Sequence, residues 1–543
     1  MLELIKSRLS ISMMLLIWGI TAQASSNTAT FLIDTKPIDQ NQACILITAS
    51  FTPDKNNELI LNFPQHALLE MSLSSSSFTG EDLGPFTRKF NFSTNEPVTF
   101  KYKYCEKNPL KHIDYPSLQP DYFYITANQV LILPYSIDDN EYHFNIQFIN
   151  IPKKWYKYTS TGQLVGEQIE TIQHMGDFAS WVFIATNSQP PVIKTKQQTL
   201  YIFKPNETKF GNENFINKLC KIINYQNKLM GYDSNSSLIV HIAQTEPGHY
   251  ILGRHPKNTI SLWIPEDRSE EEAILTLAHE HFHSWIGWQI RITQDRHEMT
   301  WFEEGINDYL AVLSTYRSGV LNEEQIVHYI NELIKKFETS PFLSVKKDNL
   351  EAIVTSNMEA KMLAGIRGHL AALSFFDYSA MEGKENSVIK AVQNITKDDR
   401  DLPENQKILE HLQENFGNQY TQILIAMHTM TTLPASMNIF DGQYVLEPKI
   451  INLPNFGFNQ KSFYESGIID EIDPQSPAYK SGLRNGMKVV GTKINKRYPS
   501  PWYINVADEK NNIVQYEFTP EFKEQAISQF TKNPRSPNLR AKG

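Results

Sequence analysis

Short stretches in which apolar and polar residues alternate dominate the chain from about residue 28 to residue 184. Examples are residues 99–104 (Thr-Phe-Lys-Tyr-Lys-Tyr), 144–148 (Phe-Asn-Ile-Gln-Phe) and 181–184 (Trp-Val-Phe-Ile), separated by clusters of Pro, Asn, Asp and Gly. A period of two residues with frequent turns is typical of antiparallel strands. We therefore predict an N-terminal antiparallel β domain over residues 25–190, which ends where two prolines interrupt the pattern.

Mixed patterns follow between residues 191 and 447. Apolar runs at residues 200–203, 238–242 and 259–264 predict strands. Apolar residues at helical spacing from residue 214 to 230, and again from 269 to about 427, predict helices. This combination indicates one domain with a sheet lobe and a helical lobe.

A third region begins near residue 448, where the pattern returns to short strands and turns up to residue 525. Residues 526–543 form a polar, basic tail. Three domains fit a chain of 543 residues, since domains commonly have about 100–150 residues. The formal net charge is −9 and no long basic tract occurs, so a nucleic-acid partner is not expected.

The N-terminus carries an export signal. Lys6 and Arg8 precede an apolar run over residues 11–20, and the small residues Ala22 and Ala24 follow. This order is that of a secretory signal peptide, predicted here as residues 1–24, and the run is short for a membrane span. We expect a periplasmic or secreted protein without a transmembrane anchor after cleavage; an uncleaved anchor is the alternative.

The three cysteines fit that compartment in part. Cys44 and Cys105 both fall in strand-rich sequence and could form a disulfide in an oxidising space, which would leave Cys220 unpaired. Three buried thiols are the other interpretation.

The strongest chemical signal lies at residues 278–285, Ala-His-Glu-His-Phe-His-Ser-Trp. Ser269 and Glu272 predict a capping box at the start of a helix that contains this sequence. His279 and His283 are four residues apart and so lie on one helix face, where both imidazoles can bind one Zn²⁺ ion. Glu280 lies between them and can take a proton from the attacking water, whereas His281 points to the opposite side and is expected in the core.

A second helix start at residues 301–311 could complete the site, because a catalytic zinc commonly has three protein ligands and one open position. Glu303 and Glu304 are both available there. One turn later, Asp308 could accept the free ring N–H of a ligating histidine and fix its tautomer.

The segments 279–285 and 301–305 (Trp-Phe-Glu-Glu-Gly) together resemble the glycyl aminopeptidase family of zinc peptidases. The resemblance implies an N-terminal β domain, a thermolysin-like catalytic domain over residues 191–447 and a C-terminal PDZ domain over residues 448–525. It also favours Glu304 over Glu303 as the third ligand, because the family has a Glu-Gly pair at this place. The expected fold is thus multidomain α+β.

The PDZ expectation rests on residues 467–487, where a strand, a turn with Ser476-Pro477 and a short helix stopped by Gly482 follow one another. Residues 455–458 (Asn-Phe-Gly-Phe) could then bind the C-terminal carboxylate of a peptide. A purely structural brace is the alternative.

Two positions depart from the family pattern. Gly365 stands where the family has a Tyr that steadies the oxyanion, and Arg367 or His369 could take its place. Arg254 stands where the family has a Glu that binds the substrate's free amine, so a preference for free N-termini is in doubt. The sequence therefore predicts a zinc-dependent hydrolase of peptides or proteins, with Arg254 as a substrate-binding residue; the alternative is an exported peptide-binding protein with the same fold and little turnover.

Overall fold

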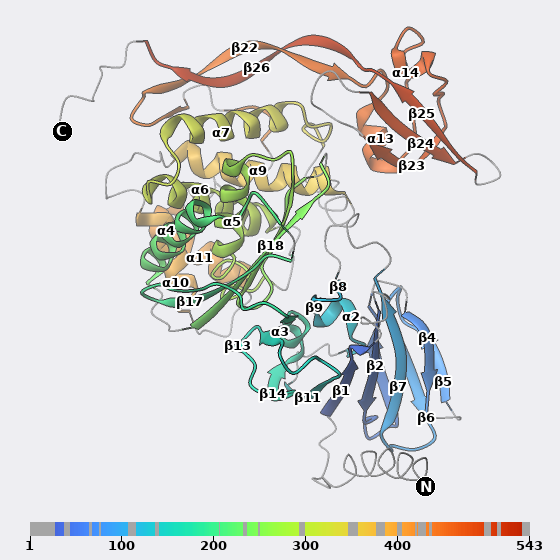
Figure 1. Ribbon diagram of the computed structural model, residues 1–543. Helices are drawn as coiled ribbons and strands as arrows, with labels where there is room; N and C mark the ends of the chain where they lie inside the picture. Colours follow the sequence, from blue (N-terminus) through green and yellow to red (C-terminus); the bar gives the residue numbers. More distant parts are fainter. Residues whose placement is uncertain are drawn as a thin grey trace, which may run out of the picture.

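The structure is a computed structural model (Figure 1). It describes residues 28–534 except 37–43, 65–67, 75–77, 107–115, 136–140, 206, 232–235, 248–249, 293–298, 346–356, 376–385, 399–403, 419–420, 422–429, 434–436, 494–500 and 508–511. The expected signal peptide lies outside the described residues, as does the tail beyond residue 534.

The N-terminal region contains two larger sheets. The first has the strand order β14 (Gln168–His174), β11 (Glu141–Ile149), β1 (Thr28–Asp34), β2 (Cys44–Phe51), β7 (Val98–Cys105) and β4 (Leu68–Leu73). The second has the order β10 (Leu133–Pro134), β3 (Glu58–Asn62), β6 (Thr87–Phe92) and β5 (Phe78–Asp82). All neighbours are antiparallel except β1 and β11. The prediction of a mainly antiparallel β region is therefore confirmed.

Cys44 and Cys105 form a disulfide between β2 and β7, where they are direct partners in the register. Cys220 is free and partly exposed. The structure therefore has the predicted disulfide and not three buried thiols.

A third sheet faces the next domain. Its order is β13 (Gly162–Gln163), β12 (Tyr156–Thr159), β15 (Val182–Thr186), β9 (Tyr122–Thr126) and β8 (Ser117–Gln119), with the short helices α2 (Ala127–Val130) and α3 (Met175–Ala179) beside it. Every residue of β9 and β15 is buried. One side joins the N-terminal core, while Tyr124 and Ile184 on the other side pack against Ile239 and Trp263 of the catalytic domain.

The region predicted as the second domain begins with a five-stranded sheet in the order β16 (Val192–Lys194), β17 (Gln198–Phe203), β18 (Ser236–Thr245), β20 (Thr259–Pro265) and β19 (Leu252–Arg254). Strands β17, β18 and β20 are parallel, and β19 is an antiparallel edge strand. Helix α4 (Glu213–Met230) connects β17 to β18; the Asn212 side chain caps its start, and Gly231 ends it in the left-handed region at φ 66°. The predicted strands and this helix are confirmed.

The helical lobe follows the sheet and carries the candidate chemistry. Its elements are α5 (Glu270–Phe282), the π-helical segment η2 (Trp301–Ile306), α6 (Asn307–Arg317), α7 (Glu323–Glu338), α9 (Met358–Phe375), α10 (Asn386–Ile395) and α11 (Glu404–Phe416). Apolar residues from α4 through α11 form one core with the sheet. Strands β18 and β20 are therefore covered by helices on one side and by the N-terminal region on the other.

The C-terminal region is a long ribbon with a small module at its end (Figure 1). Strand β22 (Tyr444–Asn455) pairs along its whole length with β26 (Glu521–Lys532), and β21 (Asn438–Ile439) joins β22. Between them lie α13 (Gln460–Ser466), α14 (Pro477–Lys480) and the sheet β23 (Lys488–Lys493), β24 (Trp502–Ala507) and β25 (Ile513–Phe518). The expected boundaries at 447/448 and 525/526 both fall inside strands of this ribbon, so residues 526–532 belong to β26 and not to a tail.

Candidate metal centre

Helix α5 presents His279 in its last turn and His283 as its C-cap residue. The Ser269 side chain accepts from the Glu272 amide (3.1 Å) and the Ser269 amide donates to the Glu272 carboxylate (3.0 Å), which is the predicted capping box. The apolar face of the helix, including Leu277 and Phe282, is fully buried in the core. The opposite face of the helix end is partly exposed at His279 and His283.

Segment η2 crosses helix α9 at very close range, because glycines meet at the crossing. A Cβ atom on Gly368 would lie 1.9 Å from the carbonyl oxygen of Trp301, and one on Gly305 would lie 2.5 Å from that of Gly365. Any side chain there would push the two elements apart. Of the six residues of η2, Glu304 alone is not buried. The crossing thus turns the Glu304 carboxylate toward the end of α5.

Three potential ligand atoms converge between these elements. The Nε2 atoms of His279 and His283 are 3.1 Å apart, and Oε2 of Glu304 lies 3.3 Å from the first and 3.9 Å from the second. In a tetrahedral zinc site with bonds of about 2.0–2.1 Å, ligand atoms are separated by about 3.3–3.4 Å. The observed spacing and the combination of two imidazoles with one carboxylate therefore fit Zn²⁺. Among the described residues, these three form the group of His, Cys, Asp or Glu side chains whose ligand atoms lie close enough together to hold a metal ion.

The other ring nitrogens of both histidines are already engaged. Nδ1 of His279 lies 3.2 Å from Asp308, and Nδ1 of His283 lies 2.8 Å from the carbonyl oxygen of Ile286. Both acceptors require a proton on Nδ1, which leaves each Nε2 with a lone pair for a metal. Asp308 also accepts from His369 (2.7 Å) and from the Tyr329 hydroxyl (2.8 Å). Burial disfavours its charge, but these hydrogen bonds hold the pKa of Asp308 below its usual value.

Glu280 lies beside the three ligand atoms and against the edge strand of the sheet. Its side chain is buried, and a Cβ on Gly253 in β19 would lie only 2.2 Å from its Oε1 atom. Burial raises the pKa of Glu280, although the charges of His283 and His279 oppose this shift. A carboxylate with a raised pKa close to a metal site can accept a proton and later release it.

A sequence comparison shows which family this site resembles. Residues 272–361, which contain most of α5, all of η2, α6 and α7, and the first turn of α9, match the family model of the M61 glycyl aminopeptidases. The chain is similar to this family over that segment. Comparison with curated proteins gave no match.

Solved structures are similar to this chain at low sequence identity. A crystal structure of an aminopeptidase N family protein from Idiomarina loihiensis aligns with a TM-score of 0.64 and 13% identity, over 92% of this chain and 98% of its own. An M1 zinc metallopeptidase from Deinococcus radiodurans gives a TM-score of 0.46 at 12% identity, over 77% and 97% of the two chains. Yeast LTA4 hydrolase in complex with bestatin gives 0.46 at 15% identity, over 77% and 70%.

The remaining predicted residues of the candidate site lie as follows. Glu303 is buried and outside the group of ligand atoms, and the core position of His281 is confirmed by full burial and a 2.6 Å contact with Gln226. Arg254 is exposed on β19 and interacts electrostatically with Glu280. Gly365 faces the site, because a Cβ there would lie 3.3 Å from the Cβ of Glu304.

The two residues suggested as replacements for a tyrosine at position 365 are engaged elsewhere. Arg367 is buried and donates to the carbonyl oxygens of Met430 (3.0 Å) and Leu343 (2.9 Å). His369 is fully buried and bound to Asp308, on the far side of His279 from the ligand atoms. Neither prediction for these residues is supported by their contacts.

Lys361 was not singled out from the sequence, yet its ammonium group lies 2.9 Å from Oε1 of Glu304. A signal existed: Lys361 is four residues before Gly365 and therefore on the same face of α9. Tyr329 was also missed, because nothing in the sequence connects it to Asp308.

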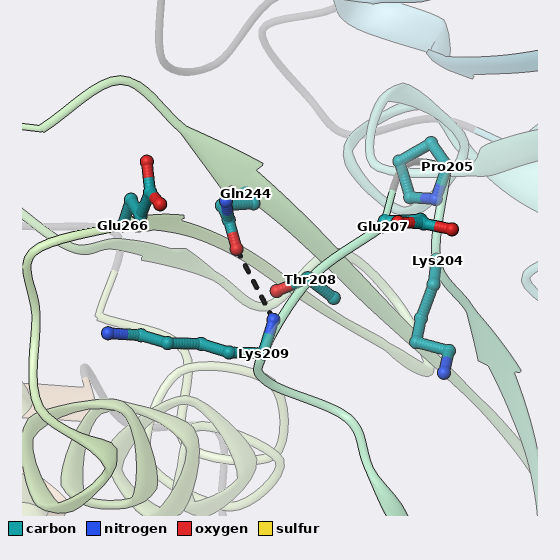
Figure 2. A pocket seen from close by; sticks show the side chains of 7 residues that line it. All are labelled: Lys204, Pro205, Glu207, Thr208, Lys209, Gln244 and Glu266. Atoms are coloured by element: carbon teal, nitrogen blue, oxygen red, sulfur yellow. Dashed lines mark hydrogen bonds between the residues drawn. The ribbon is translucent and has the colours of Figure 1, made fainter.

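A separate hollow of about 680 Å³ lies at the carboxyl ends of β17, β18 and β20 (Figure 2). It is lined by Lys204, Pro205, Glu207, Thr208, Lys209, Gln244 and Glu266. Glu266 precedes the start of α5, and the nine helical steps from Glu270 to His279 span about 14 Å. The hollow is therefore at the other end of α5 from the metal centre and contributes nothing to it.

Proposed function

We propose that this protein hydrolyses peptide bonds with zinc held by His279, His283 and Glu304, and with Glu280 as the general base. The observation that carries the proposal is the convergence of three suitable ligand atoms, within 3.9 Å of one another, beside a buried carboxylate. Zinc bound there would polarise the scissile carbonyl group and make water more acidic.

The chain's own residues account for the proton transfers. Glu280 accepts a proton as the oxygen of the attacking water bonds to the carbonyl carbon, and it passes that proton to the amine nitrogen as the C–N bond breaks. Asp308 holds the ring of His279 in one orientation and one tautomer through Nδ1. The backbone of Gly253 limits the space in which the Glu280 carboxylate can move.

We propose that the enzyme does not require a free amino terminus on its substrate. Arg254 follows Gly253 on β19 and is close enough to Glu280 to interact with its charge. A guanidinium group stays charged at every accessible pH, disfavours a second cation and attracts carboxylates. Peptides with internal scissile bonds, or with an acidic group near the bond, are therefore the proposed substrates.

A peptide-binding protein with the same metal centre and no turnover is the second candidate. Gly365 favours it, because this position supplies no side chain for the oxyanion. The test is Glu280→Gln, which preserves the shape of the side chain and removes the base. We expect this variant to retain zinc and to lose about 10²–10⁴-fold in kcat on a peptide mixture followed by mass spectrometry. Equal cleavage by both proteins would refute the mechanism, and no cleavage by the wild-type protein would favour the second candidate.

Specificity is tested with matched peptides that differ only in N-terminal acetylation. We expect acetylation to leave kcat/KM unchanged or to increase it, and Arg254→Glu to shift the ratio toward unblocked peptides by about tenfold. Arg88→Glu on β6, an exposed arginine of the N-terminal region, is the charge-reversal control. A strong preference of the wild-type enzyme for unblocked peptides would mean that another carboxylate binds the amine.

For the module formed by residues 456–518 we propose a bracing role. The amide of Gly457 donates to the Asn455 side chain (3.3 Å), and Phe456 and Phe458 are buried in the module's own core. The first contact engages one of the backbone amides that a peptide carboxylate would use in a PDZ domain. Whether the module is a PDZ domain stays a prediction.

We also propose that the protein is exported and acts in the periplasm or outside the cell. The Cys44–Cys105 disulfide supports this, because disulfides persist in oxidising compartments. Among the described residues, no helix combines the length and apolar character needed to cross a membrane. Sequencing the N-terminus of the protein purified from cells tests the predicted cleavage after Ala24.

A further inference from the structure

One face of helix α9 forms a wall of the metal centre. Lys361 and Gly365 are one turn apart and partly exposed on this face, whereas Leu363, Ala364 and Arg367 are buried. Both exposed positions are next to Glu304, through the 2.9 Å contact of Lys361 and the 3.3 Å approach at Gly365. The face therefore looks onto the place where a carbonyl group would be hydrolysed.

The missing side chain at position 365 leaves room that Lys361 can use. Helical side chains lean toward the N-terminus of their helix, so a side chain at position 365 would cover the turn that carries Lys361. Because residue 365 is a glycine, it has no side chain that would occupy the space beside Lys361. The Lys361 side chain is 45% exposed.

The two oxygens of Glu304 have different partners. Oε2 faces both histidine Nε2 atoms, and Oε1 accepts from Lys361. An ammonium group has three N–H donors, and one donor suffices for this contact with Glu304. The other two are available to an acceptor that binds beside Glu304.

We propose that Lys361 is a catalytic residue that stabilises the negative charge on the carbonyl oxygen of the scissile bond. This inference rests on the proposed peptidase function. When the water oxygen bonds to the carbonyl carbon, Glu280 takes the proton and the C=O π electrons move onto the carbonyl oxygen. Lys361 donates a hydrogen bond to that oxygen and keeps its own proton. The C–N bond then breaks, the C=O bond re-forms, and the proton on Glu280 moves to the leaving amine.

The experiment compares Lys361→Met, Lys361→Arg and the control Lys335→Met. Lys335 is a lysine on α7 that pairs with a glutamate in the same helix. For each zinc-loaded variant we would measure kcat, KM, the zinc dissociation constant by chelator competition, and the Ki of a phosphinic peptide whose anionic oxygens mimic the tetrahedral carbon. Glu280→Gln is measured in parallel.

We expect Lys361→Met to lower kcat by about 10²–10³-fold, the usual effect of losing one oxyanion donor, with KM and the zinc dissociation constant within about threefold. The Ki of the phosphinic peptide should rise along with the loss in kcat/KM. Lys361→Arg should retain activity within about tenfold, and Lys335→Met should behave as wild type.

Three results would overturn the assignment. The first is a kcat of Lys361→Met within about threefold of wild type. The second is a loss of zinc affinity in proportion to the loss of activity, which would make Lys361 a positioning residue for Glu304. The third is an arginine variant as inactive as the methionine variant. The proposed function is judged separately, because it fails if Glu280→Gln remains active, whatever the Lys361 variants do.

Discussion

At the scale of single residues, the candidate zinc site depends on which of two adjacent carboxylates points into it. In a π-helical segment each residue is turned by less than the 100° of an α-helix, and such segments often occur at functional sites. In η2 the result is that Glu303 is buried and Glu304 meets the two histidines. Glu304 then has the charges of His279, His283 and Lys361 around it. While no metal ion is bound, the hydrogen bond from His279 and these charges outweigh the effect of burial and keep the pKa of Glu304 well below its usual value.

This arrangement predicts different effects for two neighbouring substitutions. Glu304→Ala should weaken zinc binding by more than about 100-fold, because loss of a ligand costs more than loss of a group that only orients one. Glu303→Ala should leave the zinc dissociation constant within about tenfold. Chelator competition measures both constants, and circular dichroism checks that both variants fold. Zinc loss in Glu303→Ala alone would reverse the assignment.

The sequence predicted the part of the site that follows from helix periodicity. His279, Glu280 and His283 lie within two turns of one helix, so their relative directions are fixed by the 3.6-residue repeat. Glu304 needed the family resemblance in addition, because a helix start offers two adjacent carboxylates. Lys361 lies on a distant helix, and its contact with Glu304 depends on a crossing that local sequence does not encode.

At the scale of elements, two features position the site. One is the crossing of η2 and α9, and the other is the packing of the sheet that contains β18 and β20 against the sheet that contains β9 and β15. The glycines at 305 and 368 bring the two helical segments into backbone contact, and α9 in turn brings Lys361 to Glu304. On the other side, β18 and β20 are buried on both faces. Their continuous apolar sequences predicted buried strands but could not indicate that the second cover is a sheet of the N-terminal region.

His241 on β18 shows the consequence of this double cover. It is stacked 4.4 Å from Tyr124, with Tyr122 and Trp263 as further neighbours, and neither ring nitrogen has a hydrogen-bond partner among the described residues. Burial lowers the pKa of His241 from its usual 6.5 to about 3. The unfolded chain therefore binds a proton below pH 6.5 that the folded chain excludes, and stability is lost as the pH falls from 6.5 toward 3.

We predict that His241→Phe reduces this acid sensitivity. The phenyl ring can keep the stacking and has no unpartnered nitrogen. Between pH 6.5 and pH 5, the free energy of unfolding should fall by about 2 kcal/mol less in the variant than in the wild-type protein, at about 1.4 kcal/mol per pH unit and proton. Denaturant unfolding at the two pH values measures this, with His328→Phe on the exposed side of α7 as control. Parallel pH dependence in the wild-type and variant proteins would show that His241 is protonated in the folded state.

At the scale of the whole molecule, the C-terminal ribbon connects the small module to the catalytic domain. Helix α13 of the module contacts the region before α9, where Asn357 donates to the carbonyl oxygen of Tyr464. The other end of the ribbon lies on α7, so the C-terminal region contacts the helical lobe through the module at one end and through the ribbon at the other (Figure 1). The sequence predicted a separate C-terminal domain followed by a polar tail. Most residues of β26 are polar, so the pattern did not reveal that Ile527 and Phe530 are buried.

The anchor on α7 is the Asn331 side chain. Its amide group donates to the carbonyl oxygen of Phe530 (3.1 Å), and its oxygen accepts from the Phe530 amide (2.7 Å), so one side chain replaces a strand partner for that residue. The Ser528 amide adds a hydrogen bond to Glu338 (2.7 Å). In Asn331→Ala both backbone groups of Phe530 lose a partner in a partly buried place, at a cost of about 1–3 kcal/mol. This corresponds to about 5–150-fold more frequent local opening.

We therefore predict that hydrogen exchange at the Phe530 amide, measured by mass spectrometry or NMR, accelerates by that factor in Asn331→Ala. Zinc content should be unchanged, because Asn331 is not among the described residues that contact the ligand set, and the hydrogen bond from α7 to Asp308 comes from the Tyr329 hydroxyl. Lys523→Ala, an exposed change on the same strand, should leave the exchange rate at Phe530 as it is in the wild-type protein. Equal protection of Phe530 in all three proteins would show that packing of Ile527 and Phe530 alone holds the ribbon. In that case the hydrogen bonds of Asn331 would contribute little to the free energy of local opening at Phe530, which would come from burial of apolar side chains.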